Sequence, residues 1–329
     1  MKQILFVGTS LPMLYFINKY IEKFPTCYIF IFEKLNIIGG AWYNITNEYC
    51  NTIDHGLHYI PCNKNYQIYK NEFSKLGIDI ELINSFECNL NNNSEKEYKF
   101  LYAKKGWSYT LNCLLNRLYK NKNVTIKLNY QVNSININSD SCIINDKFKF
   151  DKVYIPSYIS LDNINILNNN ILLPIQIQSN EKRGITNKKM YTYHLLIFIK
   201  TDEILYDENF HGIYKDENNI FDRIMFITNK EFFKSDCVNQ VALLRISRSH
   251  KDSFKEYNNI MMLGFDFLKK KNLLHNSAVA INYQITEYSF HYRAKYIKDI
   301  ISLIEKQTNK LVMLDTHEFC YIINKTLQL

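Results

Sequence analysis

The residues whose types and spacing predict chemistry lie within the first 42 positions of the chain. An apolar run, Ile4 to Val7, stops at Gly8, and a second apolar run, Thr26 to Phe32, ends in the acid Glu33. A strand, a glycine turn, a helix, a second strand and an acid follow one another in this order in dinucleotide-binding βαβ units. A carboxylate at that position accepts hydrogen bonds from ribose hydroxyls. The alternative is a solvated acid at a strand end.

The turn after the first run keeps only part of a phosphate-binding pattern. Gly8 is the first glycine of a G-x-G-x-x-G turn, but Ser10 stands at the second position and Pro12 near the third. Ser10 could cap the helix or donate its hydroxyl to a phosphate. Downstream, the pair Gly39 and Gly40 lets the backbone pass close to a planar ligand, although a simple loop is the alternative. This pair favours a flavin dinucleotide over a nicotinamide one.

The elements that must position these residues follow from the spacing of apolar residues. A continuous apolar run predicts a buried parallel strand over Lys2–Val7. Helices are expected at Leu11–Phe24, Tyr66–Leu76, Gly106–Tyr119, Ser253–Lys271, Ala294–Gln307 and Phe319–Leu327. Val124–Leu128, Gln131–Asn136, Cys142–Ile144 and Lys147–Phe150 are expected to form a meander, and Lys152–Ile155 to return to the core sheet. Antiparallel strands are expected at Tyr191–Lys200, Arg223–Thr228 and Gln240–Ser247, a last strand at Leu311–Leu314, and a polar loop at Asn89–Glu97.

Four segments resemble the flavin-dependent amine oxidase superfamily, which includes amine oxidases, protoporphyrinogen oxidases, carotenoid desaturases and UDP-galactopyranose mutases. They are ILFVGTS at 4–10, IFIFEK at 29–34, IIGGAW at 37–42 and IDHGLHYI at 53–60. The resemblance implies that Glu33 binds the adenosine ribose of FAD. It also implies that the Gly-Gly segment runs along the pyrophosphate and ribityl chain, and that the segment 54–58 approaches the isoalloxazine ring.

The same resemblance implies a set of cofactor-binding residues. They are Gly8, Ser10, Leu11, Glu33, Lys34, Gly39, Gly40, Ala41, Trp42, Gly56, His58, Val132, Asp315 and Thr316. Val132 marks the strand pair whose backbone touches adenine in the family. Three positions where the family has glycine carry Ser10, Trp107 and Leu314 here. Each adds a side chain near the expected cofactor, which predicts reduced affinity or a rearranged pocket.

The resemblance further implies an α/β fold with an FAD-binding Rossmann-like domain of the glutathione-reductase type. It also implies an interleaved α+β substrate domain that contains an antiparallel sheet. Residues 1–65, 100–160 and 285–329 are expected to form the FAD-binding domain, and 66–99 and 161–284 the substrate domain. The implied function is an FAD-dependent oxidoreductase acting on a small molecule. The alternatives are a mutase-like flavoenzyme acting on a nucleotide sugar and a non-catalytic relative with weakened or lost FAD binding.

Few residues are candidates for taking part in the reaction itself, because in such proteins the flavin carries the redox chemistry. His58 could stabilise an anionic reduced ring or move a proton, and a structural histidine is the alternative. Arg223 and Arg245 lie on predicted strands and could clamp a carboxylate or phosphate, unless that sheet face is simply exposed. Tyr292 and Arg293 precede the predicted closing helix and are further substrate candidates.

Composition limits the possible partners. The chain has 329 residues, a net charge of +8 and a pI of about 8.8. A solvated basic surface is the favoured reading of this charge, and attraction to an anionic substrate is the functional alternative. No dense basic stripe or motif predicts a nucleic-acid partner. The 8 cysteines are dispersed and include no C-x-x-C pair, which predicts no metal site and reduced cysteines in a cytoplasmic protein. The first apolar run is too short to span a bilayer, so no integral membrane segment is expected.

Overall fold

The computed structural model describes most of the chain. The described residues are 1–42, 44–51, 53–54, 60–61, 66–92, 94–157, 164–169, 171–172, 189–207, 210–214, 220–234, 236–246, 259–291, 302, 304–306, 308–314 and 319–329. Packing divides the chain into two discontinuous compact units. The first comprises Met1–Gly40, Leu111–Met190 and Phe290–Leu329, and the second comprises Ala41–Thr110 and Tyr191–Ser289. These bounds differ from the domain limits predicted from the sequence, and the assignment of cofactor and substrate to separate domains stays a prediction.

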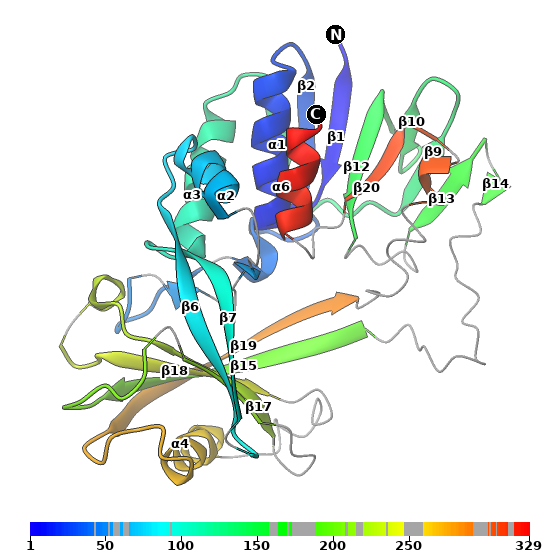
Figure 1. The fold of residues 1–329 in the computed structure, drawn as a ribbon. Helices are drawn as coiled ribbons and strands as arrows, with labels where there is room; N and C mark the ends of the chain where they lie inside the picture. The colour runs from blue at the N-terminus through cyan, green and yellow to red at the C-terminus, as the bar shows by residue number, and fades with distance from the viewer. Residues whose placement is uncertain are drawn as a thin grey trace. The chain divides into compact units, whose positions relative to one another are not determined.

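The first unit is built on a parallel sheet with the strand order β20–β12–β1–β2–β8 (Figure 1). The strands are β1 (Gln3–Val7), β2 (Tyr28–Phe32), β8 (Val124–Lys127), β12 (Lys152–Pro156) and β20 (Leu311–Leu314). Their apolar sequences suit a sheet that is covered on both faces. The prediction that β8 begins a meander is wrong, because β8 pairs with β2 in parallel.

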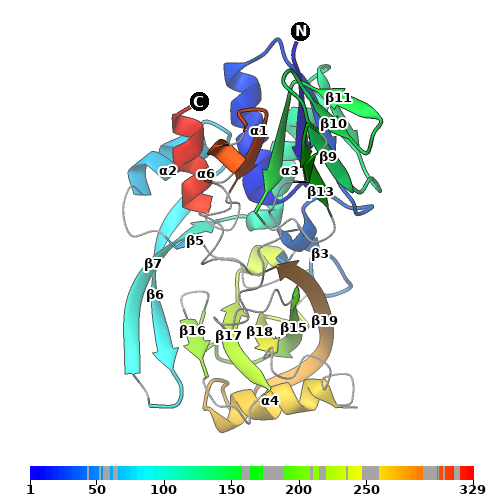
Figure 2. The ribbon, with the colours of Figure 1, turned by 90° about the vertical axis from the view of Figure 1, so that its right-hand side faces the viewer.

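Helices cover one face of this sheet and a second sheet covers the other (Figure 2). The helices are α1 (Leu11–Lys23), α6 (Phe319–Leu327) and, from Leu111 onward, α3 (Trp107–Tyr119). The second sheet contains β9 (Ser134–Ile137), β10 (Cys142–Ile144), β11 (Phe148–Phe150), β13 (Asn165–Asn168) and β14 (Ile171–Leu172). Because side chains alternate along a strand, Phe6 packs on Phe16 of α1, whereas Leu5 and Val7 join the core shared with the second sheet.

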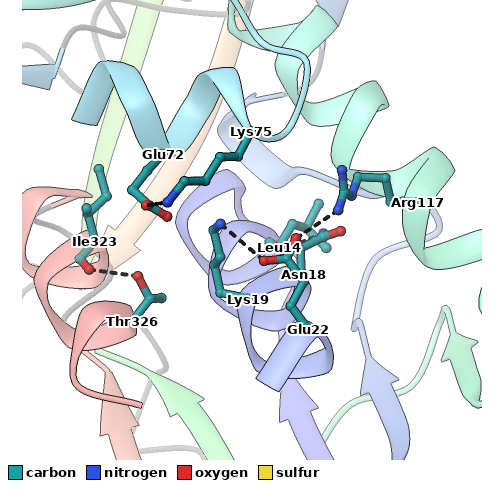
Figure 3. A network of polar contacts seen from close by, with 9 residues as sticks. All are labelled: Leu14, Asn18, Lys19, Glu22, Glu72, Lys75, Arg117, Ile323 and Thr326. Atoms are coloured by element: carbon teal, nitrogen blue, oxygen red, sulfur yellow. Dashed lines mark hydrogen bonds and ion pairs between the residues drawn. The ribbon is translucent and has the colours of Figure 1, made fainter. Parts of the chain in front are cut away.

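A buried amide fixes α1 against α3, and Figure 3 shows this amide, that of Asn18, beside Leu14. Asn18 is 4% exposed, and its amide donates to the carbonyl of Leu14 at 2.9 Å and to that of Leu114 at 3.2 Å. Nearby, the exposed carboxylate of Glu22 accepts a hydrogen bond from Arg117 at 2.8 Å. Exposed ion pairs contribute about 0–1 kcal/mol. The amide contact is therefore the stronger determinant of how the two helices pack.

The second unit contains a sheet with the order β19–β15–β18–β17–β16–β6–β7–β5. Its strands are β5 (Ile60–Pro61), β6 (Ile80–Asn89), β7 (Ser94–Ala103), β15 (Lys189–Lys200), β16 (Phe210–Ile213), β17 (Phe221–Ile227), β18 (Gln240–Ile246) and β19 (Val279–His291). The remaining elements are the pair β3 (Asn44–Ile45) and β4 (Ile53–Asp54), the helices α2 (Tyr66–Ser74) and α4 (Ile260–Lys270), and the 3₁₀ turns η1 (Gly40–Trp42) and η4 (Lys230–Phe232). α4 packs closely on this sheet, because a Cβ at Gly264 would lie 2.7 Å from Leu195 Cδ2.

The antiparallel pairing predicted around β15, β17 and β18 is confirmed. The predicted polar loop at Asn89–Glu97 is wrong in its second half, because β7 begins at Ser94 and pairs with β6 from Asn89 to Ile80. This end of β7 is polar and exposed on both faces, so it lacks the alternation of a half-buried strand. The predicted helices Ser253–Lys271 and Ala294–Gln307 lie partly outside the described residues. Within the described part of the chain, no helix has the length and apolar composition that crossing a bilayer requires.

A buried histidine in the second unit predicts a pH dependence of stability. His211 in β16 is 5% exposed, and its ring stacks on Phe100 at 5.2 Å. Burial, and next the charge of Arg223, lower the pKa of His211 to about 4. Because an unfolded histidine has a pKa near 6.5, the unfolded state binds the proton first as the pH falls. The free energy of unfolding should therefore drop by about 3 kcal/mol between pH 6.5 and pH 4.

Denaturant unfolding at a series of pH values, in the wild type and in His211→Gln, measures this effect. The variant should lose most of the slope between pH 6.5 and pH 4. An unchanged slope in His211→Gln would assign the pH dependence to other groups.

Candidate dinucleotide-binding site

The first unit brings the β1–α1 turn beside the end of β2. Gly8 has a φ of +88° and Gly39 a φ of +102°, which side chains with a Cβ adopt only under strain. The N–H of Gly8 donates to the carbonyl of Phe32 at 2.8 Å. The two strand ends are thereby held together at the turn. Gly39 and Gly40, whose φ is +55°, continue the segment that follows Glu33.

Ser10 precedes α1 but does not cap it with its side chain. Its φ of −58° and ψ of 154° suit any residue, so a glycine is not needed at this position. The hydroxyl oxygen is buried and has no hydrogen-bond partner among the described residues. The helix begins with a hydrogen bond from Leu14 N–H to the Ser10 carbonyl at 2.9 Å. A buried hydroxyl without a partner is unfavourable, and a phosphate bound at this turn would accept its hydrogen bond.

The backbone at the start of α1 adds further donors. Within the described structure, the N–H groups of Ser10, Leu11 and Met13 have no acceptor, and Pro12 in the first turn has no N–H. Unpaired N–H groups at a helix N-terminus form an anion-binding site, which the helix dipole reinforces. The β1–α1 turn therefore has the unpaired donors that an anionic group requires.

Glu33 is not the solvated acid of the alternative reading, because it is 6% exposed. Oε2 accepts hydrogen bonds from the N–H of Thr9 at 3.0 Å and from the Thr9 hydroxyl at 2.7 Å. Oε1 accepts one hydrogen bond from the N–H of Leu35 at 3.0 Å. A carboxylate oxygen accepts about two hydrogen bonds, so Oε1 keeps room for one further donor, such as a ribose hydroxyl.

Thr9 belongs to the same hydrogen-bonded group as Glu33 and Gly39, and it was not among the residues predicted from the sequence. It is 1% exposed, and its Oγ1 accepts a hydrogen bond from the N–H of Gly39 at 3.0 Å. Its hydroxyl thereby connects the turn after β1 both to Glu33 and to the Gly-Gly segment. Two features of the sequence could have indicated this role. Thr9 is a small polar residue directly after Gly8, where the first strand ends, and the second strand ends in the acid Glu33.

The other predicted cofactor residues have different environments. Lys34 is exposed, and Leu11 is fully buried as the first residue of α1. The side chain of Val132 is 4% exposed and packs in the core, and no described residue hydrogen-bonds to its backbone N–H or C=O. This free backbone could meet an adenine edge. Ala41 lies in η1, and its side chain is outside the described part of the chain.

In the second unit, Asp54 caps the start of α3. Its Oδ2 accepts the N–H of Trp107 at 3.0 Å, and Oδ1 accepts the N–H of Ser108 at 2.9 Å. Burial raises the pKa of the Asp54 carboxyl, although these hydrogen bonds oppose the shift. The ring of Trp107 is 1% exposed and packs edge-to-face on Trp42 at 6.0 Å. Trp107, at a position where the family has glycine, is therefore a core residue.

The two predicted substrate arginines lie directly opposite each other, Arg223 on β17 and Arg245 on β18. The guanidinium of Arg245 makes a bidentate contact with Asp222, with Nε–Oδ1 at 2.7 Å and Nη2–Oδ2 at 2.5 Å. Asp222 lies where the pairing of β17 with β18 shifts its register, and such irregularities redirect side chains. The positive charge of Arg245 is thus already paired with an internal carboxylate.

Several predicted site residues lie outside the described residues. They are Gly56, His58, Tyr292, Arg293, Asp315 and Thr316. Leu314, at another family glycine position, is the fully buried last residue of β20. Within the described ranges, no group of three or more His, Cys, Asp or Glu side chains could hold a metal ion.

Comparison with solved structures identifies the fold. A protoporphyrinogen oxidase-like protein from Exiguobacterium sp. 255-15 matches with a TM-score of 0.67 and 9% identity, over 100% of this chain and 98% of that one. Reduced UDP-galactopyranose mutase gives 0.67 and 9%, over 99% and 93%. Wild-type putrescine oxidase bound to putrescine gives 0.64 and 8%, over 99% and 97%. No family model matches the sequence, and no curated protein does.

These similarities define the class of fold. The chain has a mixed α/β fold, with parallel and antiparallel sheets, like that of these three proteins. The mixed α/β fold that the resemblance implied is thereby confirmed.

Proposed function

We propose that this protein binds FAD and acts as an FAD-dependent oxidoreductase on a small molecule. The observation that carries the proposal is the β1–α1 turn. There, Gly8, the unpartnered Ser10 hydroxyl and the open N–H groups of α1 lie in the same unit as the hydrogen-bonded group of Thr9, Glu33 and Gly39. The similarity in fold to UDP-galactopyranose mutase and putrescine oxidase supports FAD as the dinucleotide.

The residues of the first unit would divide the binding of FAD among them. The Ser10 hydroxyl and the N–H groups at the start of α1 would bind the pyrophosphate. The open acceptor site of Glu33 would take a ribose hydroxyl, and the backbone of Val132 would meet adenine. Gly39 and Gly40 would let the chain run close to the cofactor without a side chain between them. When bound, FAD supplies the two-electron redox chemistry.

The role of His58 as a group that holds or moves a proton near the ring remains part of this proposal. The substrate-binding residues proposed are Arg223, Arg245, Tyr292 and Arg293. The layering of the first unit supports a glutathione-reductase-type cofactor domain, and the antiparallel sheet of the second unit supports a substrate domain. The dispersed cysteines, which include no C-x-x-C pair, support a reducing, cytoplasmic location.

The net charge of +8 supports an anionic substrate. Among the compounds in the names of the structural neighbours, protoporphyrinogen and UDP-galactopyranose are anionic, whereas putrescine is a dication. We therefore expect turnover of an anionic compound rather than of a diamine. A mutase-like enzyme is the second candidate, because reduced UDP-galactopyranose mutase matches with the same TM-score as the protoporphyrinogen oxidase-like protein.

Substrate turnover by the FAD-loaded protein tests this proposal. Oxidation of protoporphyrinogen, with bleaching of the flavin absorbance when oxygen is excluded, would support the oxidoreductase. Turnover of UDP-galactopyranose only after reduction with dithionite, with no net oxidation, would support the mutase and contradict the oxidoreductase. Turnover restricted to putrescine would contradict the expected anionic substrate.

A further inference from the structure

We propose that Thr9 is a positioning residue for the cofactor, because its hydroxyl holds the Gly39–Gly40 segment at the β1–α1 turn and orients Glu33. This inference rests on the proposed binding of FAD. It assigns to this chain a contact that a glycine-rich turn alone would not provide.

The hydroxyl of Thr9 has a defined direction in this network. Glu33 Oε2 has only acceptor sites when ionised, so the Thr9 O–H must donate to it across 2.7 Å. The lone pairs of the same oxygen then accept the N–H of Gly39 at 3.0 Å. One hydroxyl is therefore donor and acceptor at once, which a valine of similar shape cannot be.

Because the residues of this network are buried, each of its hydrogen bonds is costly to lose. Thr9 and Glu33 are 1% and 6% exposed, and Gly39 is buried as well, so water does not readily replace a lost contact. Without the hydroxyl, the N–H of Gly39 loses its acceptor, and Oε2 of Glu33 loses one of its two donors. The Gly-Gly segment would then be released from the turn that it faces.

The network also determines which acceptor position of the Glu33 carboxylate remains for a ligand. Oε2 is filled by Thr9, and Oε1 already accepts the N–H of Leu35. A single acceptor position therefore remains, and its direction is set by the three hydrogen bonds within the protein. Because these bonds are made by the protein's own groups, the cofactor does not have to order this carboxylate, and the ordering part of the binding free energy is smaller.

The experiment compares Thr9→Val with Thr9→Ser in the full-length protein. For Thr9→Val, the Kd for FAD is expected to rise about tenfold, and the Gly39 amide should exchange its hydrogen faster in the protein without FAD. Thr9→Ser keeps the hydroxyl and should bind FAD within about threefold of the wild type. If the valine variant does not fold, Thr9→Cys tests the same contact, since a thiol is a weak donor and acceptor.

A matched control separates positioning from general stability. Thr201 is another buried threonine, 3% exposed, whose hydroxyl donates to the carbonyl of Glu203 at 2.8 Å in the second unit. Thr201→Val should unfold at a lower temperature and leave the Kd for FAD unchanged. A Kd that rises as much in this variant would overturn a specific role for Thr9.

The outcomes distinguish the two proposals. Wild-type protein that does not bind FAD would contradict the proposed function, whereas exchange of the Gly39 amide would still test the contact made by Thr9. FAD binding that is equal in the wild type and in Thr9→Val would overturn the positioning role and leave the proposed function standing. A serine variant as weak as the valine variant would also overturn it.

Discussion

Glu33→Ala is expected to abolish measurable FAD binding and to lower the free energy of unfolding by about 3 kcal/mol or more. The substitution removes the acceptor of three donors, which are the N–H and hydroxyl of Thr9 and the N–H of Leu35. Each buried donor without a partner costs about 1–3 kcal/mol. Denaturant unfolding measures the loss of stability, and titration with FAD measures the loss of affinity.

Glu22→Ala is the matched control for this variant. Glu22 is a glutamate of the same unit with an exposed side chain that forms ion pairs with Lys19 and Arg117. Its removal should change the free energy of unfolding by less than about 1 kcal/mol and should leave FAD binding unchanged. If Glu33→Ala bound FAD as tightly as Glu22→Ala, the ribose-binding role of Glu33 would be refuted.

Asp54→Ala is expected to destabilise the start of α3 and to lower the free energy of unfolding by about 2 kcal/mol. The N–H groups of Trp107 and Ser108 would both lose the carboxylate that caps them. Asp54→Asn keeps the shape and one acceptor oxygen, so it should be the milder variant. An alanine variant as stable as the wild type would contradict the capping role.

The pH dependence of Asp54 provides a second test of the same contact. Burial raises the pKa of its carboxyl above the unfolded value of about 3.9. The folded state therefore binds the proton more tightly, and its stability falls as the pH rises from about 3.9 through the folded pKa, with no further change above it. The difference in unfolding free energy between the wild type and Asp54→Asn should show this slope. A flat difference would contradict the raised pKa.

The elements that are visible from the sequence are those built from local patterns. Continuous apolar residues predicted the strands beside Gly8 and Glu33, and the spacing of leucines predicted α3. The polar start of β7 and the position of β8 at the sheet edge were missed. Both depend on a partner strand elsewhere in the chain, because polar exposed residues give a strand no local signature.

The same difference between local patterns and contacts with distant residues applies to the candidate site. Gly8 and Gly39 were recognisable, since their backbone conformations exclude most other residues. The contacts of Thr9 were not, because Glu33 and Gly39 lie 24 and 30 positions away. The contact of Arg245 was not recognisable either, because nothing in the pattern of its strand reveals Asp222, 23 positions earlier, as its partner.

Titration of the purified wild-type protein with FAD, followed by calorimetry and thermal unfolding, tests the central claim most directly. NAD serves as the comparison ligand, because it shares the adenosine and pyrophosphate but lacks the flavin. Saturable, stoichiometric binding of FAD is predicted, tighter than that of NAD. FAD at about 100 times its Kd should stabilise the protein by about 2.7 kcal/mol. A protein that shows no heat of binding and no thermal shift with FAD would contradict this account.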